Sequence, residues 1–598
     1  MLPVASAPGP SDRLRAWFEF PTAHRPAPSA DGRWIYLISN RPGFPSAYRI
    51  PSAGGPPVRF TTGTERVGDV LPSPAGTEVV VVQDAGGNER WALSLVREDG
   101  TVARAVTARA DRIHEPGDWR DGERFVYRSN ERDERFFDIY EVRPHREELP
   151  RCLRAEDATV EVAAASPNRI LLLRAVTNID RDLLLWTDEG ETLLNPRAEE
   201  HAVFDADLTS ESVYAATNPG REFTGLYRYR FVASTPEPLG RFPGDVERVR
   251  ADHGERCLAV VVNDQGYGRL FTHDLTSGET NPIPTPTDGV IGAVRWSPDD
   301  RQLLFDLSSP TEGVSVYRSD RTGSEVRCLV PPDRPFPGPR RAPTPGRVRA
   351  EDGLEVPYWE FLPEGPPRAT IVEVHGGPEA QARPQFQPRV LFLVGEGYRV
   401  LLPNVRGSLG YGRTYLHLDD VRRRMDSVRD LRDVVWALCP RERREGTGGK
   451  VGVIGGSYGG FMVLAALTTY PDLFDAGVDI VGISNFVTFL ERTGPWRRRI
   501  REFEYGSLEH DREFLRSISP LFHADRIQAP LLVLHGTNDP RVPLFEAEQI
   551  VAELRRRNVP VELLQFGDEG HGLVRRENQL VGYGRAASFL EAHLTGRG

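Results

Sequence analysis

The first half of the chain repeats one short pattern of polar and hydrophobic residues. A turn rich in Ser, Asp, Pro and Gly precedes a run of β-branched or other apolar residues, as in residues 29–36 and 297–305. Seven copies begin at residues 29, 73, 120, 166, 209, 252 and 297, so the pattern recurs every 43 to 47 residues. Such a period of strands and tight turns is typical of β-propellers, in which each blade has four strands. We therefore expect a seven-bladed β-propeller over residues 25–340.

The pattern changes after a proline-rich segment, residues 331–345, which we expect to act as a stiff spacer. From residue 347 onward, short apolar strands alternate with helical patterns, which predicts a mostly parallel sheet with helices on both faces. This C-terminal α/β domain is expected to cover residues 341–598. Before the first repeat, Leu14, Trp17, Phe18 and Phe20 suggest an N-terminal extension, residues 1–24, that packs on the α/β domain.

A serine stands at a sharp turn in the α/β region. The apolar run 451–454 ends at two glycines, Ser457 follows, and two more glycines precede a helical pattern at residues 461–467. A strand, turn and helix in this order expose a serine hydroxyl at the edge of a parallel sheet, and glycines are needed because the turn is tight. Ser457 is therefore predicted to be a nucleophile.

Two further residues follow strand ends in the order that α/β-hydrolases use. Asp539 comes after the apolar run 530–535, and His571 comes after the run 561–566. A serine hydroxyl needs a neighbouring base to take its proton, so we expect His571 to act as general base and then as acid. Asp539 is expected to orient the imidazole and stabilise its charged form. The C-terminal domain is thus predicted to be an α/β-hydrolase with a Ser457–Asp539–His571 triad.

An oxyanion hole is predicted from a fourth motif. The apolar strand 369–374 runs into His-Gly-Gly-Pro at residues 375–378, which is similar to the His-Gly-Gly loop that supplies a backbone donor in hydrolases. We expect the backbone N–H groups of Tyr458 and Gly377 to hold the developing oxyanion.

Composition excludes several other classes of protein. The net charge of −11 argues against nucleic-acid binding, which requires a basic face. No apolar run reaches the length of a membrane span, and the first residues lack the pattern of an export signal. The four cysteines are scattered and form no Cys-x-x-Cys pair, so we expect a cytoplasmic protein without a disulfide framework, metal or other cofactor.

The whole arrangement resembles the prolyl oligopeptidase family of serine peptidases. The motifs that carry the resemblance are found at residues 375–378, 404–412, 455–460, 535–539 and 570–572. Within the family, the His-Gly-Gly-Pro loop is most similar to that of the acylaminoacyl-peptidase branch. The resemblance implies that the propeller covers the active site and admits only short peptides, and that the chain assembles as a homo-oligomer, a dimer or a tetramer.

Which end of a peptide is held stays open at this stage. Dipeptidyl peptidases of the family bind a free amine with a pair of propeller glutamates, and the adjacent pairs 147–148 and 199–200 stand in no recognisable context. The family also builds part of its substrate pocket from the stretch 493–501. Arginines pair well with carboxylates, so one or two of the arginines there are hypothesised to bind a terminal carboxylate, while Trp496 lines an apolar pocket. The arginines concerned are Arg497, Arg498, Arg499 and Arg501. The alternatives are a solvated basic face and a core tryptophan.

Three functions are compatible with the residues. The leading one is a serine peptidase of exopeptidase type, either acylaminoacyl-peptidase-like or carboxypeptidase-like, that cleaves short peptides through an acyl-enzyme. An esterase uses the same triad, but simple esterases rarely carry so large an additional domain. A non-catalytic propeller scaffold is disfavoured, because nucleophile, base, orienting acid and oxyanion loop are all present together.

Overall fold

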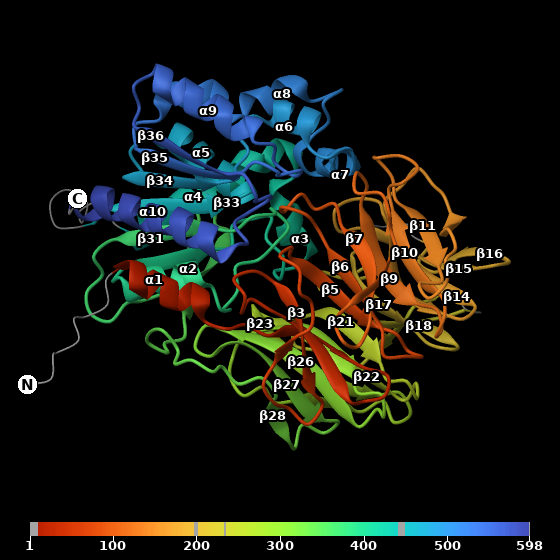
Figure 1. Cartoon of the computed structure of the whole chain (residues 1–598). Helices are drawn as coiled ribbons and strands as arrows, with labels where there is room; N and C mark the ends of the chain where they lie inside the picture. The colour runs from red at the N-terminus through yellow and green to blue at the C-terminus, as the bar shows by residue number, and fades with distance from the viewer. Residues whose placement is uncertain (1–9, 197–200, 232–234, 440–448, 597–598) are drawn as a thin grey trace, which may run out of the picture.

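The N-terminal domain is a ring of four-stranded antiparallel sheets (Figure 1). The computed structural model describes residues 10–196, 201–231, 235–439 and 449–596. Within them, seven sheets each use four consecutive strands, so each sheet is one propeller blade. The seven-bladed propeller expected from the repeats is confirmed. Each repeated phrase forms the turn between the first and second strands of its blade; in blade 1, the N–H of Ser29 donates to the carbonyl of Trp34 at 2.9 Å.

The strands of the propeller follow one another blade by blade. Blades 1 to 4 contain β1 (His24–Pro28), β2 (Trp34–Ser39), β3 (Ser46–Pro51), β4 (Val58–Arg59); β5 (Val67–Pro72), β6 (Val79–Gln83), β7 (Ala92–Val96), β8 (Val102–Ala105); β9 (His114–Trp119), β10 (Phe125–Ser129), β11 (Asp138–Val142), β12 (Arg151–Arg154); and β13 (Val160–Ser166), β14 (Arg169–Ala175), β15 (Arg181–Thr187), β16 (Gly190–Leu193). Blades 5 to 7 contain β17 (Val203–Leu208), β18 (Ser212–Thr217), β19 (Gly225–Arg230), β20 (Glu237–Leu239); β21 (Asp245–Ala251), β22 (Cys257–Asp264), β23 (Tyr267–Asp274), β24 (Thr280–Ile283); and β25 (Val290–Trp296), β26 (Gln302–Ser309), β27 (Gly313–Asp320), β28 (Val326–Cys328).

Blades 1 and 7 close the ring by packing against each other. The N–H of Ala23 donates to the carbonyl of Val314 at 3.0 Å. Ile35 of blade 1 and Leu304 of blade 7 belong to the same buried apolar cluster. Because each blade takes its four strands from one stretch of chain, the ring is closed by side-chain packing and a few hydrogen bonds rather than by a strand shared between blades.

The C-terminal domain is built on one eight-stranded sheet, in the order β29-β30-β32-β31-β33-β34-β35-β36. From β32 onward along this order the neighbours are parallel, whereas β29, β30 and β32 pair antiparallel. The strands are β29 (Thr344–Arg349), β30 (Glu355–Phe361), β31 (Thr370–Val374), β32 (Arg399–Pro403), β33 (Val451–Gly456), β34 (Ala476–Ile480), β35 (Leu531–Gly536) and β36 (Val561–Phe566). This sheet confirms the predicted α/β-hydrolase fold.

Helices cover both faces of this sheet (Figure 1). One face carries α1 (Pro10–Glu19), α2 (Pro388–Gly395) and α10 (Arg576–Thr595), and the other carries α4 (Arg424–Leu438), α5 (Tyr458–Thr469) and α9 (Phe545–Arg556). The shorter helices are α3 (Arg413–Leu416), α6 (Phe486–Arg492), α7 (Pro495–Tyr505), α8 (Arg512–Ser517), η1 (His417–Asp419), η2 (Val421–Arg423) and η4 (Pro520–Arg526). Helix α5 is apolar on all sides, and such a helix is stable only when it is enclosed; its residues from Tyr458 to Thr468 are buried.

The N-terminal helix α1 lies on the α/β-hydrolase domain although it precedes the propeller in the chain. Leu14, Trp17, Phe18 and Phe20 share one buried cluster with residues of α2 and α10. Phe18 stacks on Tyr583 with ring centroids 5.4 Å apart. The chain therefore enters the propeller from the hydrolase and returns to it, so both ends of the propeller are tied to the second domain.

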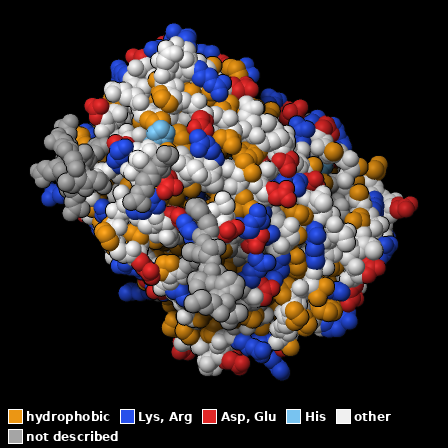
Figure 2. Space-filling model, turned by 60° about the vertical axis from the view of Figure 1, so that its left-hand side comes forward, with side chains coloured by type: hydrophobic (Ala, Val, Ile, Leu, Met, Phe, Trp, Pro, Cys, Tyr) orange, Lys and Arg blue, Asp and Glu red, His pale blue; other side chains and the backbone are white. Residues whose placement is uncertain are grey.

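Charged side chains of both signs are mixed over the face of the molecule drawn in Figure 2. Elsewhere in the described residues, too, opposite charges pair locally, as Arg585 of α10 does with Glu562 of β36. Among the described residues, no helix is both long and apolar enough to cross a membrane.

Candidate active site

Ser457 occupies a strained turn between β33 and α5. Its backbone angles are φ 59° and ψ −119°, a region that non-glycine residues rarely adopt and that is held only where the surroundings enforce it. The flanking glycines are required by close packing: a Cβ on Gly455 would lie 2.2 Å from the carbonyl oxygen of Gly459, and one on Gly459 would lie 2.2 Å from that of Val374. Ser457 itself is half-buried, so its hydroxyl stands at the open end of the sheet.

Asp539 and His571 lie at the same edge of the sheet as Ser457, because β33, β35 and β36 are parallel and all three residues follow strand ends. The Nδ1 atom of His571 is 2.7 Å from Oδ2 of Asp539. The other oxygen of Asp539 accepts hydrogen bonds from the N–H groups of Arg541 at 2.8 Å and Val542 at 3.0 Å. The carboxylate is thus fixed on one side by backbone and presents its second oxygen to the imidazole.

Electrostatics keep Asp539 in the form that can orient His571. Burial raises the pKa of Asp539, but the imidazole of His571 and the hydrogen bonds it accepts outweigh burial, so its pKa lies below the ordinary value. A second histidine, His535, lies 3.8 Å from Asp539. Burial lowers the pKa of His535, so it remains neutral and does not compete for the carboxylate charge.

The loop that follows β31 lies directly against the nucleophile turn. A Cβ on Gly376 would be 3.4 Å from Cβ of Ser457. Helix α7 holds the following residue of this loop, because the carbonyl of Gly377 accepts hydrogen bonds from Nη1 of Arg501 and from the hydroxyl of Tyr505, each at 3.3 Å. The second predicted donor, Tyr458, is the first residue of α5, where helix N–H groups have no partner within the helix. Tyr458 thus follows Ser457 directly, and Gly377 follows Gly376, the residue of this loop that lies against Ser457.

The predicted arginines lie on α7, which faces the propeller, and they divide between two cavities. Arg497 and Arg501 line a cavity of about 260 Å³ between α7 and blades 2 to 4. Arg498 and Arg499 line a second cavity, of about 290 Å³, on the other flank of the helix. Trp496 contributes to both cavities, so it is not a core residue.

Two of these arginines pair with a carboxylate, and the other two, Arg497 and Arg499, make no ion pair with a described residue. Arg498 pairs with Glu502 at 3.1 Å on the surface, and Arg501 pairs with Glu379 at 3.2 Å. The exposed Arg499 donates to a backbone carbonyl. Arg497 makes no ion pair with a described residue, and its Nε is shielded from solvent without a hydrogen-bond partner. Burial, together with Arg501 and Arg541, lowers the pKa of Arg497 to about 9, so an incoming anion would relieve an unfavourable environment.

The first cavity contains charged residues that sequence patterns did not reveal. Its propeller wall carries Glu89, Glu115 and Glu161. Glu115 and Glu161 both pair with Arg128, and Glu89 pairs with Arg541. These residues come from three different blades, and isolated glutamates in strands carry no motif. Of the glutamate pairs considered from sequence, 147–148 lies in the hairpin between β11 and β12 with no part in this cavity, and 199–200 lies outside the described residues.

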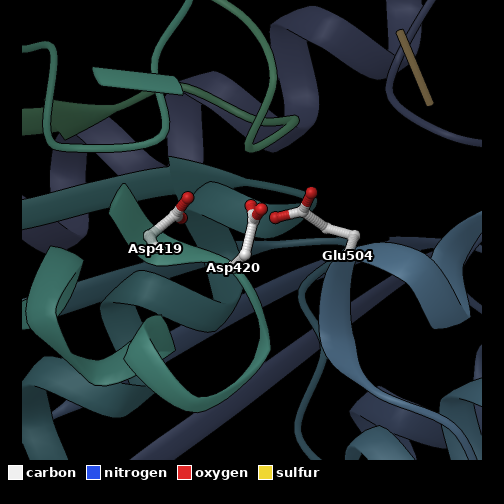
Figure 3. A group of neighbouring side chains, drawn as sticks. All are labelled: Asp419, Asp420 and Glu504. Atoms are coloured by element: carbon white, nitrogen blue, oxygen red, sulfur yellow. The ribbon is translucent and has the colours of Figure 1, made fainter. Parts of the chain in front are cut away.

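A group of acidic residues lies behind the oxyanion loop. Asp419, Asp420 and Glu504 place carboxylate oxygens within 4.8 Å of one another, with Glu504 reaching from α7 toward the two aspartates (Figure 3). Carboxylates at this spacing can bind a cation. Here the guanidinium of Arg424 pairs with both Asp419 and Glu504. The guanidinium of Arg424 therefore already neutralises these carboxylates, and the group does not fit a metal ion.

Comparison with known proteins relates part of the α/β-hydrolase domain to a family. The sequence profile described as "Prolyl oligopeptidase family" matches residues 384–597. The chain is 34% identical over 304 residues to dipeptidyl peptidase family member 6 of Caenorhabditis elegans, covering 50% of this chain and 38% of the relative. It is 30% identical over 399 residues to the human (Homo sapiens) acylamino-acid-releasing enzyme, covering 63% of this chain and 52% of the relative. The matched segments thus span only about 40 to 50% of these relatives.

The solved structures extend the likeness of fold to the whole chain. A puromycin hydrolase structure superposes with a TM-score of 0.85 at 20% identity, covering 99% of this chain and 98% of that one. Because the identity is low, this match shows the fold alone. The profile match and the sequence relatives add a likeness for part of the chain: residues 384–597, in the α/β-hydrolase domain, are similar to the prolyl oligopeptidase family.

Proposed function

We propose that this protein is a serine peptidase that hydrolyses short peptides through an acyl-enzyme. Ser457 attacks the scissile carbonyl while His571 takes its proton and later passes it to the leaving amine. Asp539 holds the imidazole through the 2.7 Å hydrogen bond to Nδ1, which leaves Nε2 as the nitrogen that can take the serine proton. The N–H groups of Tyr458 and Gly377 receive the oxyanion. Water then attacks the acyl-enzyme as His571 takes its proton, and the ester bond to Ser457 breaks as the imidazole returns that proton to the serine oxygen, which releases the acid product.

The observation that carries this proposal is the strained Ser457 turn at the same sheet edge as the His571–Asp539 pair. Strain at one residue persists only where the surrounding structure enforces it, and here the strained residue is a serine at the sheet edge that carries an acid and a base. The sequence relatives are consistent with it, since one is named as a dipeptidyl peptidase and the other as an acylamino-acid-releasing enzyme.

The cavity between α7 and the propeller supports exopeptidase action. It is bounded by Arg541, two residues beyond Asp539, and by Arg501, which holds the oxyanion loop, so it adjoins the reacting atoms. A volume of about 260 Å³ accommodates a few side chains rather than a folded protein. The glutamates of this cavity are already paired with arginines, whereas Arg497 has no carboxylate partner among the described residues. We therefore favour recognition of a terminal carboxylate by Arg497 over recognition of a free amine, with Trp496 forming apolar wall.

The experiment uses one short peptide in four forms: free at both ends, blocked at either end, and blocked at both ends. Products are identified by mass spectrometry, with Ser457→Ala as the control for hydrolysis at this site. Carboxylate recognition predicts that C-terminal amidation lowers kcat/KM by about 100-fold, the scale of one charge-assisted pair. Equal cleavage of the amide and the acid would contradict it. If the form with a blocked amino terminus is cleaved fastest whether or not its carboxyl terminus is amidated, the acylaminoacyl-peptidase alternative is supported.

A matched pair of variants tests the arginine itself. Arg497→Met should remove discrimination between acid and amide, because it deletes the unpartnered guanidinium and keeps the length of the side chain. Arg498→Met is the control, since Arg498 is exposed and pairs with Glu502 on the surface; it should stay within about twofold of the wild type. Discrimination that survives Arg497→Met would exclude this residue as the anchor.

Assembly and compartment are proposed on more general grounds. We propose a homo-oligomer, a dimer or tetramer, from the family resemblance; light scattering that gives 66.8 kDa, the mass of one chain, would contradict this. We also propose a cytoplasmic location, supported by Cys152, Cys257 and Cys328, which form no disulfide. Cell fractionation that recovers the protein outside the cytoplasm would overturn the proposed location.

A further inference from the structure

A buried polar network connects the propeller to the back of the oxyanion loop. Asn178, in the loop between β14 and β15, reaches out of the propeller, and its amide nitrogen donates to Glu379 and, at 3.4 Å, to Glu504. Glu379 comes directly after Pro378, the last residue of the oxyanion loop, and Glu504 is near the end of α7. One propeller side chain thus bridges two elements of the catalytic domain.

Each of the two glutamates is tied to a different side of the oxyanion hole. Glu379 pairs with Arg501, and Arg501 also donates to the carbonyl of Gly377 at 3.3 Å. Glu504 pairs with Arg424, which donates to the hydroxyl of Tyr458 at 3.2 Å. A single arginine therefore connects each proposed oxyanion donor to one of the two glutamates that Asn178 bridges: Arg501 for Gly377, and Arg424 for Tyr458.

The charges of the network require the donor that Asn178 provides. Three carboxyl groups, from Glu379, Asp419 and Glu504, share the two guanidinium groups of Arg424 and Arg501. Burial, and then the proximity of Glu379, raises the pKa of Glu504 well above its ordinary value. Two carboxyls on one side of an amide can only be satisfied by its NH₂ group. The carbonyl oxygen of Asn178 has no partner among the described residues, so the side chain serves as a donor.

We propose that Asn178 is a positioning residue for catalysis: by bridging Glu379 and Glu504, it couples docking of the propeller to the placement of the oxyanion loop. This inference rests on the proposed serine peptidase activity. Asn178 acts only when the propeller is docked on the catalytic domain, so the oxyanion hole is held in its working geometry only in the closed arrangement. A small displacement of an oxyanion donor weakens stabilisation of the transition state more than it weakens substrate binding.

The test compares Asn178→Leu with Thr177→Val in the full-length chain. Leucine is close in size to asparagine but has no donor. Thr177 is the preceding residue of the same loop, and its hydroxyl accepts a hydrogen bond from the N–H of Asp180, which lies in that loop, so its variant reports damage to the loop. We expect Asn178→Leu to lower kcat by about 10-fold or more with KM within about 3-fold, and Thr177→Val to stay within about 2-fold.

Affinity for a transition-state analogue gives a second readout. A peptide boronate forms a tetrahedral adduct with Ser457, so its inhibition constant should rise by the same factor as kcat falls, while that of a product peptide stays constant. Parallel loss of boronate and product affinity, or a change in KM alone, would overturn the inference, since either would mean that Asn178 holds substrate. Wild-type protein that hydrolyses no peptide would instead refute the proposed function, and labelling of Ser457 by a fluorophosphonate separates that case from misfolding.

An isosteric variant adds a pH profile that a merely structural role would not change. Asn178→Asp can donate to Glu379 only when protonated, and it adds a charge to the cluster when ionised. Its direct ionisable partners are Glu379 and Glu504. The groups linked to those two on neighbouring elements are Asp419, Asp420, Arg424, Tyr458, Arg501 and Tyr505, with His417 beside Asp420. Asp180 lies on the same loop as Asn178. The activity of Asn178→Asp relative to the wild type at the same pH should therefore fall from pH 6 to pH 9. A ratio that is constant with pH would overturn the proposal.

Discussion

Glu89 of the propeller and Arg541 of the catalytic domain form an ion pair, with 2.7 Å between Oε2 and Nε. Arg541 follows Asp539 by two residues, and its N–H donates to the Asp539 carboxylate. The same propeller loop contacts the histidine loop, where a Cβ on Gly570 would lie 1.8 Å from the carbonyl oxygen of Gly87. The β6–β7 loop therefore docks on both segments that carry the base and its orienting acid.

The Glu89–Arg541 pair should affect catalysis through docking rather than through the chemistry of the triad. Glu89→Gln and Arg541→Gln are each expected to lower kcat/KM for a peptide by about 10-fold, with the loss smaller at high salt because the Arg541 side chain is partly exposed. Hydrolysis of a small activated ester, which needs no propeller contact, should change by less than about 3-fold. In the double variant the losses should not add, because each single change already breaks the pair; additive losses would show that the residues act independently.

Removing the charge of Asp539 should be more damaging than any change to the docking contacts. Asp539→Asn keeps the shape of the side chain but presents an amide to Nδ1 of His571, which favours the wrong tautomer. We expect kcat to fall by about 10⁴-fold. The control is Asp568→Asn, because Asp568 is exposed on the loop that leads to His571 and should stay within about 3-fold. Steady-state kinetics with active-site titration distinguish loss of rate from loss of folded protein.

Position 459 requires glycine because there is no space for a side chain. A Cβ there would lie 2.2 Å from the carbonyl oxygen of Val374, in the strand that leads to the oxyanion loop. Gly459→Ala should therefore displace β31 from α5 and abolish labelling of Ser457 by a fluorophosphonate. Gly395→Ala is the matched control, since a Cβ at Gly395 meets nothing within 4 Å. Because Gly395 ends helix α2, alanine there should be neutral or slightly stabilising. Full labelling of Gly459→Ala would contradict the assigned contact.

Asp479 of β34 should make the stability of the catalytic domain depend on pH. Its carboxyl is completely buried beside Gly460 and Gly482, and burial raises its pKa to about 7. Between the unfolded value of 3.8 and about 7, the folded state holds a proton that the unfolded state has released. Stability is therefore lost as the pH rises through this range, by an upper limit of about 4 kcal/mol.

Asp479→Asn isolates this contribution because the amide cannot ionise. The Tm of the variant should match that of the wild type near pH 4 and exceed it above pH 7, with the difference growing between those values. Scanning calorimetry across this range measures it. A difference in Tm that is independent of pH would mean that Asp479 is not the group responsible. Asp511→Asn, at a half-buried surface position paired with Arg422, serves as the control.

The propeller and the order of the catalytic residues could be predicted from sequence because both depend on local patterns. A blade repeats its own turn and strand every 43 to 47 residues, and hairpin turns are encoded by neighbouring residues. The Ser457 turn is similarly local, since the glycines that permit it lie within three residues. Parallel strands then bring Asp539 and His571 to the same edge without further information.

What only the tertiary structure decided is the partner of each charge. From sequence, Arg497, Arg498, Arg499 and Arg501 were equivalent candidates; the structure separates them, because residues at successive positions of a helix point in different directions. Arg501 meets Glu379, Arg498 meets Glu502, and Arg497 faces a cavity whose glutamates are paired elsewhere. The bridge from Asn178 to Glu379 spans 201 positions of the chain. Contacts of that kind leave no periodic trace in a sequence, because they join residues of two different domains that are far apart along the chain.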